Sequence, residues 1–205
     1  AATCEYVHFF ASDDFLEPTF YEKSIEQLER YPKASFSSTL TRTVDSEGID
    51  LGFIKTPIVS LKPAYFSPDE VKYKLKQCGI WQMSCATVYR RETFENIGLL
   101  NSDFYRLRSF LDTFIILLLA LKNGCIFIPE VLSVLRKGEA SFSAKMAKNE
   151  KNHADIVNFF KELTVTRFSD IFPKEFVRDF ERSFWGLHLI YLSKLDSQTR
   201  LKKLN

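Results

Sequence analysis

The sequence predicts an α/β fold in which a mixed sheet is flanked by helices and followed by a C-terminal helical extension. Residues 1–143 alternate short aromatic or β-branched runs with segments of helical periodicity, whereas residues 144–205 contain helical patterns only. The 205-residue chain also carries 20 Phe against 7 Gly and 7 Pro, which indicates an ordered chain with a large core. We therefore expect one sheet-containing domain over residues 1–143 and the extension over residues 144–205.

The first predicted strand runs from residue 6 to residue 10 and leads directly to two adjacent carboxylates. It is aromatic or β-branched except at His8, which we interpret as a buried structural histidine. After Ser12 come Asp13 and Asp14, at the carboxyl end of a predicted central strand, where open α/β sheets bind ligands. Neighbouring carboxylates repel unless a cation or a proton neutralises them. The pair indicates a divalent-metal site or, more simply, a helix cap, a common role of Asp.

The remaining elements follow in order from periodicity and from helix-end signals. We predict helices over residues 20–30, 67–78, 92–97, 112–123, 145–163 and 174–195, and strands over residues 34–44, 85–90 and, as a pair around a proline, 125–137, with a short strand and a loop over residues 49–66. The clearest helix start is Ser67 as N-cap, with Pro68 in the first turn and Glu70 completing a capping box. The apolar helix that ends before Gly124 is too short to span a membrane, which takes about 20 residues.

Four stretches resemble family 2 glycosyltransferases of the GT-A fold. Residues 1–18, Ala-Ala-Thr-Cys-Glu-Tyr-Val-His-Phe-Phe-Ala-Ser-Asp-Asp-Phe-Leu-Glu-Pro, are similar to the middle of such an enzyme, and the resemblance continues in order at residues 88–100, at residues 111–112 and at residues 123–136. The resemblance implies a GT-A-like sheet. In that family a nucleotide-binding half precedes the metal motif, so we expect this chain to be a fragment or a processing product of a longer enzyme.

The resemblance implies metal-dependent transfer of a sugar, with inversion, from a nucleotide-sugar donor to an acceptor hydroxyl. Asp13 and Asp14 would hold Mn²⁺ or Mg²⁺, and Asp112 matches the family's base that deprotonates the acceptor. The acceptor would be a carbohydrate or a lipid-linked molecule, in the synthesis of a cell-surface polysaccharide or glycolipid. From its position alone, Asp112 could equally cap the helix that follows it.

Four further residues are expected at the donor and acceptor sites. Ser12 adjoins the metal motif, and Arg136 matches a family arginine near the donor diphosphate. Trp81 could stack on a sugar and Gln82 could bind a hydroxyl, because the family's corresponding segment lines the sugar pocket. Trp81 as an ordinary core residue is an equally good interpretation.

Three positions depart from the family pattern. Ala11 stands where many members have Asp, Leu111 where they commonly have Glu, and Gly138 where they often have His. A non-catalytic GT-A-like binding or partner module would explain these departures, and we keep it as the alternative function.

Charge and cysteine content limit the partners and the compartment. The net charge of +2 is too balanced for a dedicated nucleic-acid binder. The four cysteines, Cys4, Cys78, Cys85 and Cys125, lack metal-ligand spacing, and no signal peptide is visible, so we expect free buried thiols in a reducing cytoplasm. The basic end at residues 200–204 could adhere weakly to the inner membrane face or simply be solvated. The apolar stripe of the last predicted helix could pack on the core or on a partner, including a second copy of the chain.

Overall fold

The computed structural model describes residues 3–54, 56–98, 103–138, 150–175 and 177–178. The chain divides into two compact units, Ala1–Phe160 and Lys161–Asn205. Helix α6 (Glu150–Val165) passes from the first unit into the second. The domain boundary expected at residue 143 and most of the helix expected over residues 174–195 lie outside the described residues.

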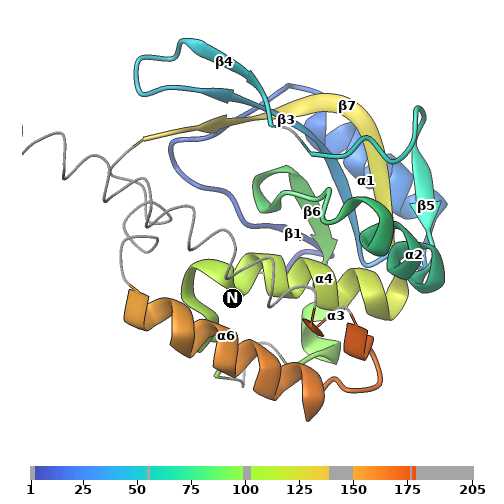
Figure 1. The fold of residues 1–205 in the computed structure, drawn as a ribbon. Coiled ribbons are helices and arrows are strands. Elements are labelled where there is room, and N and C mark those ends of the chain that lie inside the picture. Colours follow the sequence, from blue (N-terminus) through green and yellow to red (C-terminus); the bar gives the residue numbers. More distant parts are fainter. Residues whose placement is uncertain (1–2, 55, 99–102, 139–149, 176, 179–205) are drawn as a thin grey trace, which may run out of the picture. The chain divides into compact units, whose positions relative to one another are not determined.

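The first unit has the predicted mixed α/β architecture (Figure 1). Its strands are β1 (Tyr6–His8), β2 (Phe15–Leu16), β3 (Phe36–Val44), β4 (Asp50–Phe53), β5 (Ala64–Phe66), β6 (Thr87–Arg90) and β7 (Cys125–Arg136). Its helices, besides the first part of α6, are α1 (Phe20–Arg30), α2 (Pro68–Cys78), η1 (Ser84–Ala86), α3 (Arg91–Asn96), η3 (Phe104–Phe110) and α4 (Leu111–Asn123).

These strands form one mixed sheet with the order β1-β6-β3-β7-β2. The long strands β3 and β7 run parallel at its centre, and β6 lies antiparallel between β1 and β3. Strand β4 extends the far end of β3 as a hairpin, which projects at the top of Figure 1, and β5 pairs with the start of β7. The ends of β1, β3 and β7 therefore point the same way. The expectation that the strand before the carboxylates is central was wrong, because β1 pairs only with β6 and lies at the edge of the sheet.

Strand β7 is continuous across Pro129, where the sequence predicted two short strands. Thr39 of β3 lies opposite Ile128, and the next residue, Leu40, lies opposite Val131. Pro129 and Glu130 therefore have no paired residue on β3 and form a bulge. A proline lacks the N–H that a ladder needs, so it is tolerated in a strand at a bulge such as this one. The prediction of a break was wrong because the bulge accommodates the proline within a single strand.

The apolar core on one face of the sheet lies beneath α1. A cluster of buried side chains joins this helix to β6 and β7: Phe20, Leu28, Ala34, Val88, Ile126, Ile128 and Leu132. The apolar spacing of Tyr21, Ile25 and Leu28 predicted the helix, which is confirmed. It did not predict the buried face: Tyr21 is 46% exposed, and the buried residues of α1 are Phe20, Ser24, Gln27 and Leu28.

The capping signals of α2 are also confirmed. The Ser67 side chain accepts the backbone N–H of Glu70, and the Glu70 carboxylate accepts the backbone N–H of Ser67. This reciprocal pair satisfies two helix-end donors that would otherwise face solvent alone. The helix ends at Gly79, which has φ of 77° and ψ of −160°.

Some short elements differ from the sequence prediction. Strand β1 stops at His8 rather than residue 10, because its pairing with β6 ends at the pair His8–Val88. Strands β2 and β5, each two or three residues long, were not predicted. Helix η3, which contains Arg108 at a φ of 49°, was also missed.

All four cysteines are free thiols, as predicted, but only two of them are buried. Cys85 and Cys125 lie in the core, whereas Cys4 and Cys78 are exposed. The expectation of four buried thiols was wrong because Cys4 precedes the first strand and Cys78 lies on the last turn of α2, where no element covers them.

The second unit is described over its first residues only. After α6 the chain turns at residues 166–172, and Phe168, Phe172 and Val177 are buried. None of the helices in the described ranges is long and apolar enough to cross a membrane.

Candidate functional site

The predicted metal motif lies in a loop, residues 11–14, between β1 and β2. The backbone N–H of Asp14 donates to the Ala11 carbonyl oxygen at 3.3 Å, which closes the turn. Asp14 is buried, with 7% of its surface exposed, whereas Ser12 and Asp13 are exposed. The two carboxylates therefore have different environments although they are adjacent.

Arg136, at the end of β7, binds this loop through both its backbone and its side chain. Its backbone N–H donates to Oδ1 of Asp14 at 2.9 Å, and its Nε donates to the Asp13 carbonyl oxygen at 3.3 Å. Its Nη1 donates to the carbonyl oxygens of Asp45 and Ser46, at 3.1 and 2.7 Å, in the turn after β3. The structure thus brings together three of the predicted site residues, Asp13, Asp14 and Arg136.

Burial raises the pKa of the Asp14 carboxyl, and the negative charge of Asp13 raises it further. The hydrogen bond from the Arg136 N–H and the charge of its guanidinium partly offset these effects, because they favour the ionised carboxyl. A cation bound next to Asp14 would act in the same direction. A bound cation would therefore stabilise the ionised carboxylate of Asp14, which Arg136 already stabilises in part.

Asp112 lies in the first turn of α4, with both of its carboxylate oxygens hydrogen bonded. Oδ1 accepts the backbone N–H of Thr113 at 2.7 Å, and Oδ2 accepts the Ser84 hydroxyl at 2.7 Å. The N-cap position of α4 belongs to Phe110, so Asp112 is not the cap that its position in the sequence allowed. Its side chain is exposed, as contact with a substrate would require.

The buried thiol of Cys85 is affected by the charges of both acidic positions. Burial raises the pKa of this thiol to about 11, and the negative charges of Asp14 and Asp112 both contribute to the rise. A hydrogen bond with Thr41 of β3 acts in the opposite direction. The charges of two carboxylates from distant parts of the sequence therefore act on one side chain, in the η1 turn that precedes β6.

His8 connects β1 to this same turn. Its Nε2 donates to the Cys85 carbonyl oxygen at 3.2 Å, and its Nδ1 accepts the Tyr21 hydroxyl at 3.1 Å. The ring also contacts the aromatic rings of Phe10 and Phe20, with centroids 5.2 and 5.1 Å away. Both ring nitrogens are occupied, so His8 is a structural histidine in its neutral form, as we expected.

We expect the protein to lose stability as the pH falls below about 6.5, the ordinary pKa of histidine. Burial lowers the pKa of His8, so the folded chain takes up this proton less readily than the unfolded chain. Between the two pKa values the unfolded state binds more protons, so lowering the pH favours unfolding, by at most about 1.4 kcal/mol per pH unit for one proton.

Thermal unfolding of wild type and His8→Gln between pH 5 and pH 7.5 measures this effect. Gln lacks a titrating group but can donate to the Cys85 carbonyl oxygen. The variant should show a flatter dependence of the melting temperature on pH. Parallel curves for the two proteins would exclude His8 as the source.

Trp81 and Gln82 lie in the core, which is the other interpretation that the sequence left open. Trp81 is 1% exposed and contacts Phe66 edge to face, with centroids 6.1 Å apart. Gln82 is 3% exposed and its Nε2 is 3.6 Å from the Cys125 sulfur. Neither side chain presents a surface to solvent in this structure, so the described conformation has no sugar-stacking face at Trp81.

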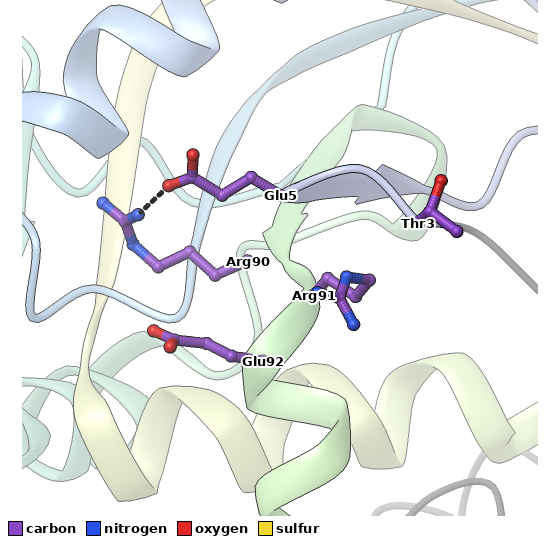
Figure 2. A pocket seen from close by; sticks show the side chains of 5 residues that line it. All are labelled: Thr3, Glu5, Arg90, Arg91 and Glu92. Carbon is purple, nitrogen blue, oxygen red and sulfur yellow. Dashed lines mark hydrogen bonds and ion pairs between the residues drawn. The ribbon is translucent and has the colours of Figure 1, made fainter.

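A pocket of about 270 Å³ lies at the opposite end of β1 from the carboxylates (Figure 2). Its lining residues are Thr3, Glu5, Arg90, Arg91 and Glu92. The Arg90 guanidinium donates to Glu5 at 3.3 Å and its Nε donates to the Ala34 carbonyl oxygen at 3.2 Å. Figure 2 shows Glu5 directed at Arg90, and Arg91 directed away from it. Because Arg90 is already paired and buried, this pocket has a structural explanation.

The comparisons with known proteins add no family. Neither a scan against protein-family models nor a search of curated proteins finds a match to this chain. Within the part of the chain that the structure describes, no group of three or more His, Cys, Asp or Glu side chains is placed to hold a metal ion. Conclusions about function therefore depend on the geometry of the carboxylates.

Sequence reasoning missed two members of this arrangement, Ser84 and Cys85. Ser84 donates a hydrogen bond to Asp112, and the charges of Asp14 and Asp112 both raise the pKa of the Cys85 thiol. Neither residue belongs to a motif, and their position depends on how η1 meets α4, a contact between segments distant in the sequence. No local signal marks such a contact.

Proposed function

We propose that this chain takes part in metal-dependent sugar transfer from a nucleotide-sugar donor to an acceptor hydroxyl. One observation carries the proposal: Asp13, Asp14 and Arg136 lie together in the loop that follows β1, where the Arg136 backbone N–H donates to Oδ1 of Asp14 and its Nε donates to the Asp13 carbonyl oxygen. The loop supplies carboxylates for a cation, and the exposed carboxylate of Asp112 supplies a second acidic position for proton transfer. The mixed sheet, with this loop after its edge strand β1, is compatible with a GT-A-like arrangement.

Two of the ligands that a hard divalent cation needs are present in the carboxylate loop. Asp13 and Asp14 offer carboxylate oxygens, the ligand type that Mg²⁺ and Mn²⁺ prefer. Oδ1 of Asp14 already accepts the Arg136 N–H, and the described residues offer no third acidic ligand there. Mg²⁺ commonly takes one or two protein carboxylates, with the remaining ligands from phosphate and water. Bound there, the ion would neutralise the departing nucleoside diphosphate.

Asp112 would act as the general base. Its exposed carboxylate would accept the proton of the acceptor hydroxyl as that oxygen attacks the anomeric carbon of the donor. The bond between the anomeric carbon and the diphosphate oxygen breaks in the same step, and the configuration inverts. Each carboxylate oxygen accepts one hydrogen bond, from Ser84 or from Thr113, and keeps a second lone pair that can accept this proton.

Calorimetric titration with UDP, GDP, TDP and CMP, each with and without Mn²⁺, tests the proposal. We expect one nucleotide to bind in the presence of metal only, and Asp14→Asn to weaken that binding about tenfold or more, because a charged ligand is lost. Asn keeps an oxygen that can accept the Arg136 N–H, so the loop should retain its structure.

The melting temperature of Asp14→Asn should equal or exceed that of wild type near pH 7. The raised pKa of Asp14 means that ionising it costs folding free energy at neutral pH, and Asn removes that cost. Asp69→Asn, at an exposed carboxylate paired with Lys72 on α2, is the matched control and should leave binding unchanged. Equal binding by wild type and Asp14→Asn would contradict a metal role for Asp14.

A non-catalytic binding module is the second candidate function. The burial of Trp81 and Gln82 and the engagement of the Arg136 guanidinium by backbone carbonyls both favour it, because they reduce the side chains open to a donor. Under this alternative no nucleotide binds in a metal-dependent way, so the same titration distinguishes the two functions.

A further inference from the structure

A single serine hydroxyl from a separate segment holds the carboxylate of Asp112. Ser84 donates to Oδ2 at 2.7 Å, while Oδ1 is held from within α4 by the backbone N–H of Thr113. The two donors come from different elements and bind different oxygens. Together they fix the rotation of the carboxylate about the Cβ–Cγ bond of Asp112. With only one of the two donors, this rotation would be less restricted.

The segment that carries Ser84 is itself anchored on several sides. The Cys85 carbonyl oxygen accepts His8 Nε2, which ties the turn to β1. The Met83 carbonyl oxygen accepts the hydroxyl of Thr87 at 2.6 Å and the backbone N–H of Ala86 at 3.1 Å. Because the backbone on both sides of Ser84 is held, its hydroxyl is presented from a fixed position.

A hydrogen bond to an ionised carboxylate is shorter and stronger than one between neutral groups. The Ser84 bond has the length typical of such a contact. The Asp112 side chain is exposed, so packing does not restrict it and its hydrogen bonds determine where it points. Loss of the Ser84 donor would therefore change the orientation of Asp112 more than the stability of the fold.

We propose that Ser84 is a positioning residue, which orients the Asp112 carboxylate toward the acceptor hydroxyl. This inference rests on the proposed function, because it assigns Ser84 a role through the general base. It names a residue in the turn before β6 that no motif in the sequence identifies. Displacing a reacting group by about 1 Å can cost a hundredfold in rate, so one hydrogen bond is sufficient to matter.

Steady-state release of nucleoside diphosphate tests the inference, with the full 205-residue chain, Mn²⁺ and a panel of UDP-glucose, UDP-N-acetylglucosamine, GDP-mannose and TDP-glucose. Water serves as the acceptor, so no acceptor need be known. Ser84→Ala and Ser84→Cys both remove the hydroxyl, and each should lower kcat about tenfold to a hundredfold with an unchanged KM for the donor. Ser84→Thr keeps a hydroxyl and should retain kcat within about threefold.

Ser60→Ala is the matched control. It removes a serine hydroxyl that donates to the Lys62 carbonyl oxygen at 2.7 Å, in the loop before β5, so kcat should stay near the wild-type value. Wild-type kcat in both hydroxyl-free variants would overturn the positioning role alone. An equal decrease of kcat in Ser84→Thr and Ser84→Ala would also overturn the positioning role, since the rate would then not depend on the hydroxyl. No release by wild type with any donor would overturn the proposed function and this inference together.

Discussion

Asp112→Asn should lower the turnover of sugar transfer by about a thousandfold and leave the affinity for the nucleotide unchanged. General-base catalysis contributes about a hundredfold to ten-thousandfold, and an amide cannot accept the proton. The substitution is isosteric: the Asn oxygen can accept the Thr113 N–H, and the Asn amide nitrogen can donate to the Ser84 hydroxyl oxygen in place of the bond that Ser84 donates to Asp112. Rate loss should therefore occur without unfolding.

Single-turnover release of nucleoside diphosphate and calorimetry on the same preparation separate these two effects. Asp103→Asn is the matched control, because Asp103 is an exposed carboxylate just before η3 that pairs with Arg106 at 3.2 Å. It should leave turnover unchanged. If Asp112→Asn turned over at the wild-type rate, Asp112 would be removed from the mechanism and the proposed site would lose its base.

Gly124→Ala should destabilise the fold by about 3–5 kcal/mol, or prevent folding. Gly124 ends α4 with φ of 81° and ψ of 173°, a conformation almost exclusive to glycine. A Cβ there would lie 2.3 Å from the Phe66 carbonyl oxygen and 2.7 Å from the Tyr65 hydroxyl. The total destabilisation is the sum of the backbone strain and the steric clash with the backbone of β5.

Gly79→Ala separates the two contributions. Gly79 ends α2 in a similar conformation, with φ of 77° and ψ of −160°, but a Cβ added there would have no atom within 4 Å. It should therefore cost only the backbone strain, about 1–3 kcal/mol. Urea unfolding of the two variants measures the difference, and similar losses would show that the contact with β5 relaxes at little cost.

Local signals in the sequence predicted the helices well. The capping box at Ser67 and the glycine that ends α4 each act within one or two turns, so the sequence alone was sufficient. Periodicity over residues 20–30 predicted α1 but not which of its faces is buried. The long strand β3 was also predicted, because its nine residues alternate over a range where periodicity can be recognised.

The missed elements depend on partners far along the chain. Strand β2 is two residues long and exists because Phe15 pairs with Val134. Strand β5 exists because Ala64 to Phe66 pair with the start of β7. A strand of two or three residues has no periodicity to recognise, so its identity comes from the sheet that receives it.

The candidate site was predictable in part for the same reason. The pairing of Asp13 with Asp14 is visible in the sequence, and the structure adds Arg136 to them through the register of β7. Trp81 could not be assigned from the sequence, because an aromatic side chain near a pocket and one in the core have the same local pattern. Only the tertiary packing distinguishes them.

The guanidinium of Arg136 has a further consequence for any anion that approaches the carboxylate loop. Its nitrogens already donate to backbone carbonyls of Asp13, Asp45 and Ser46, which belong to two separate loops. A phosphate that binds through Nε or Nη1 must displace some of those carbonyls, so that contact is an exchange of partners rather than an addition. The free energy of anion binding is then only the difference between the two sets of hydrogen bonds. Each loop whose carbonyl is displaced also loses its contact with the Arg136 guanidinium when the anion binds.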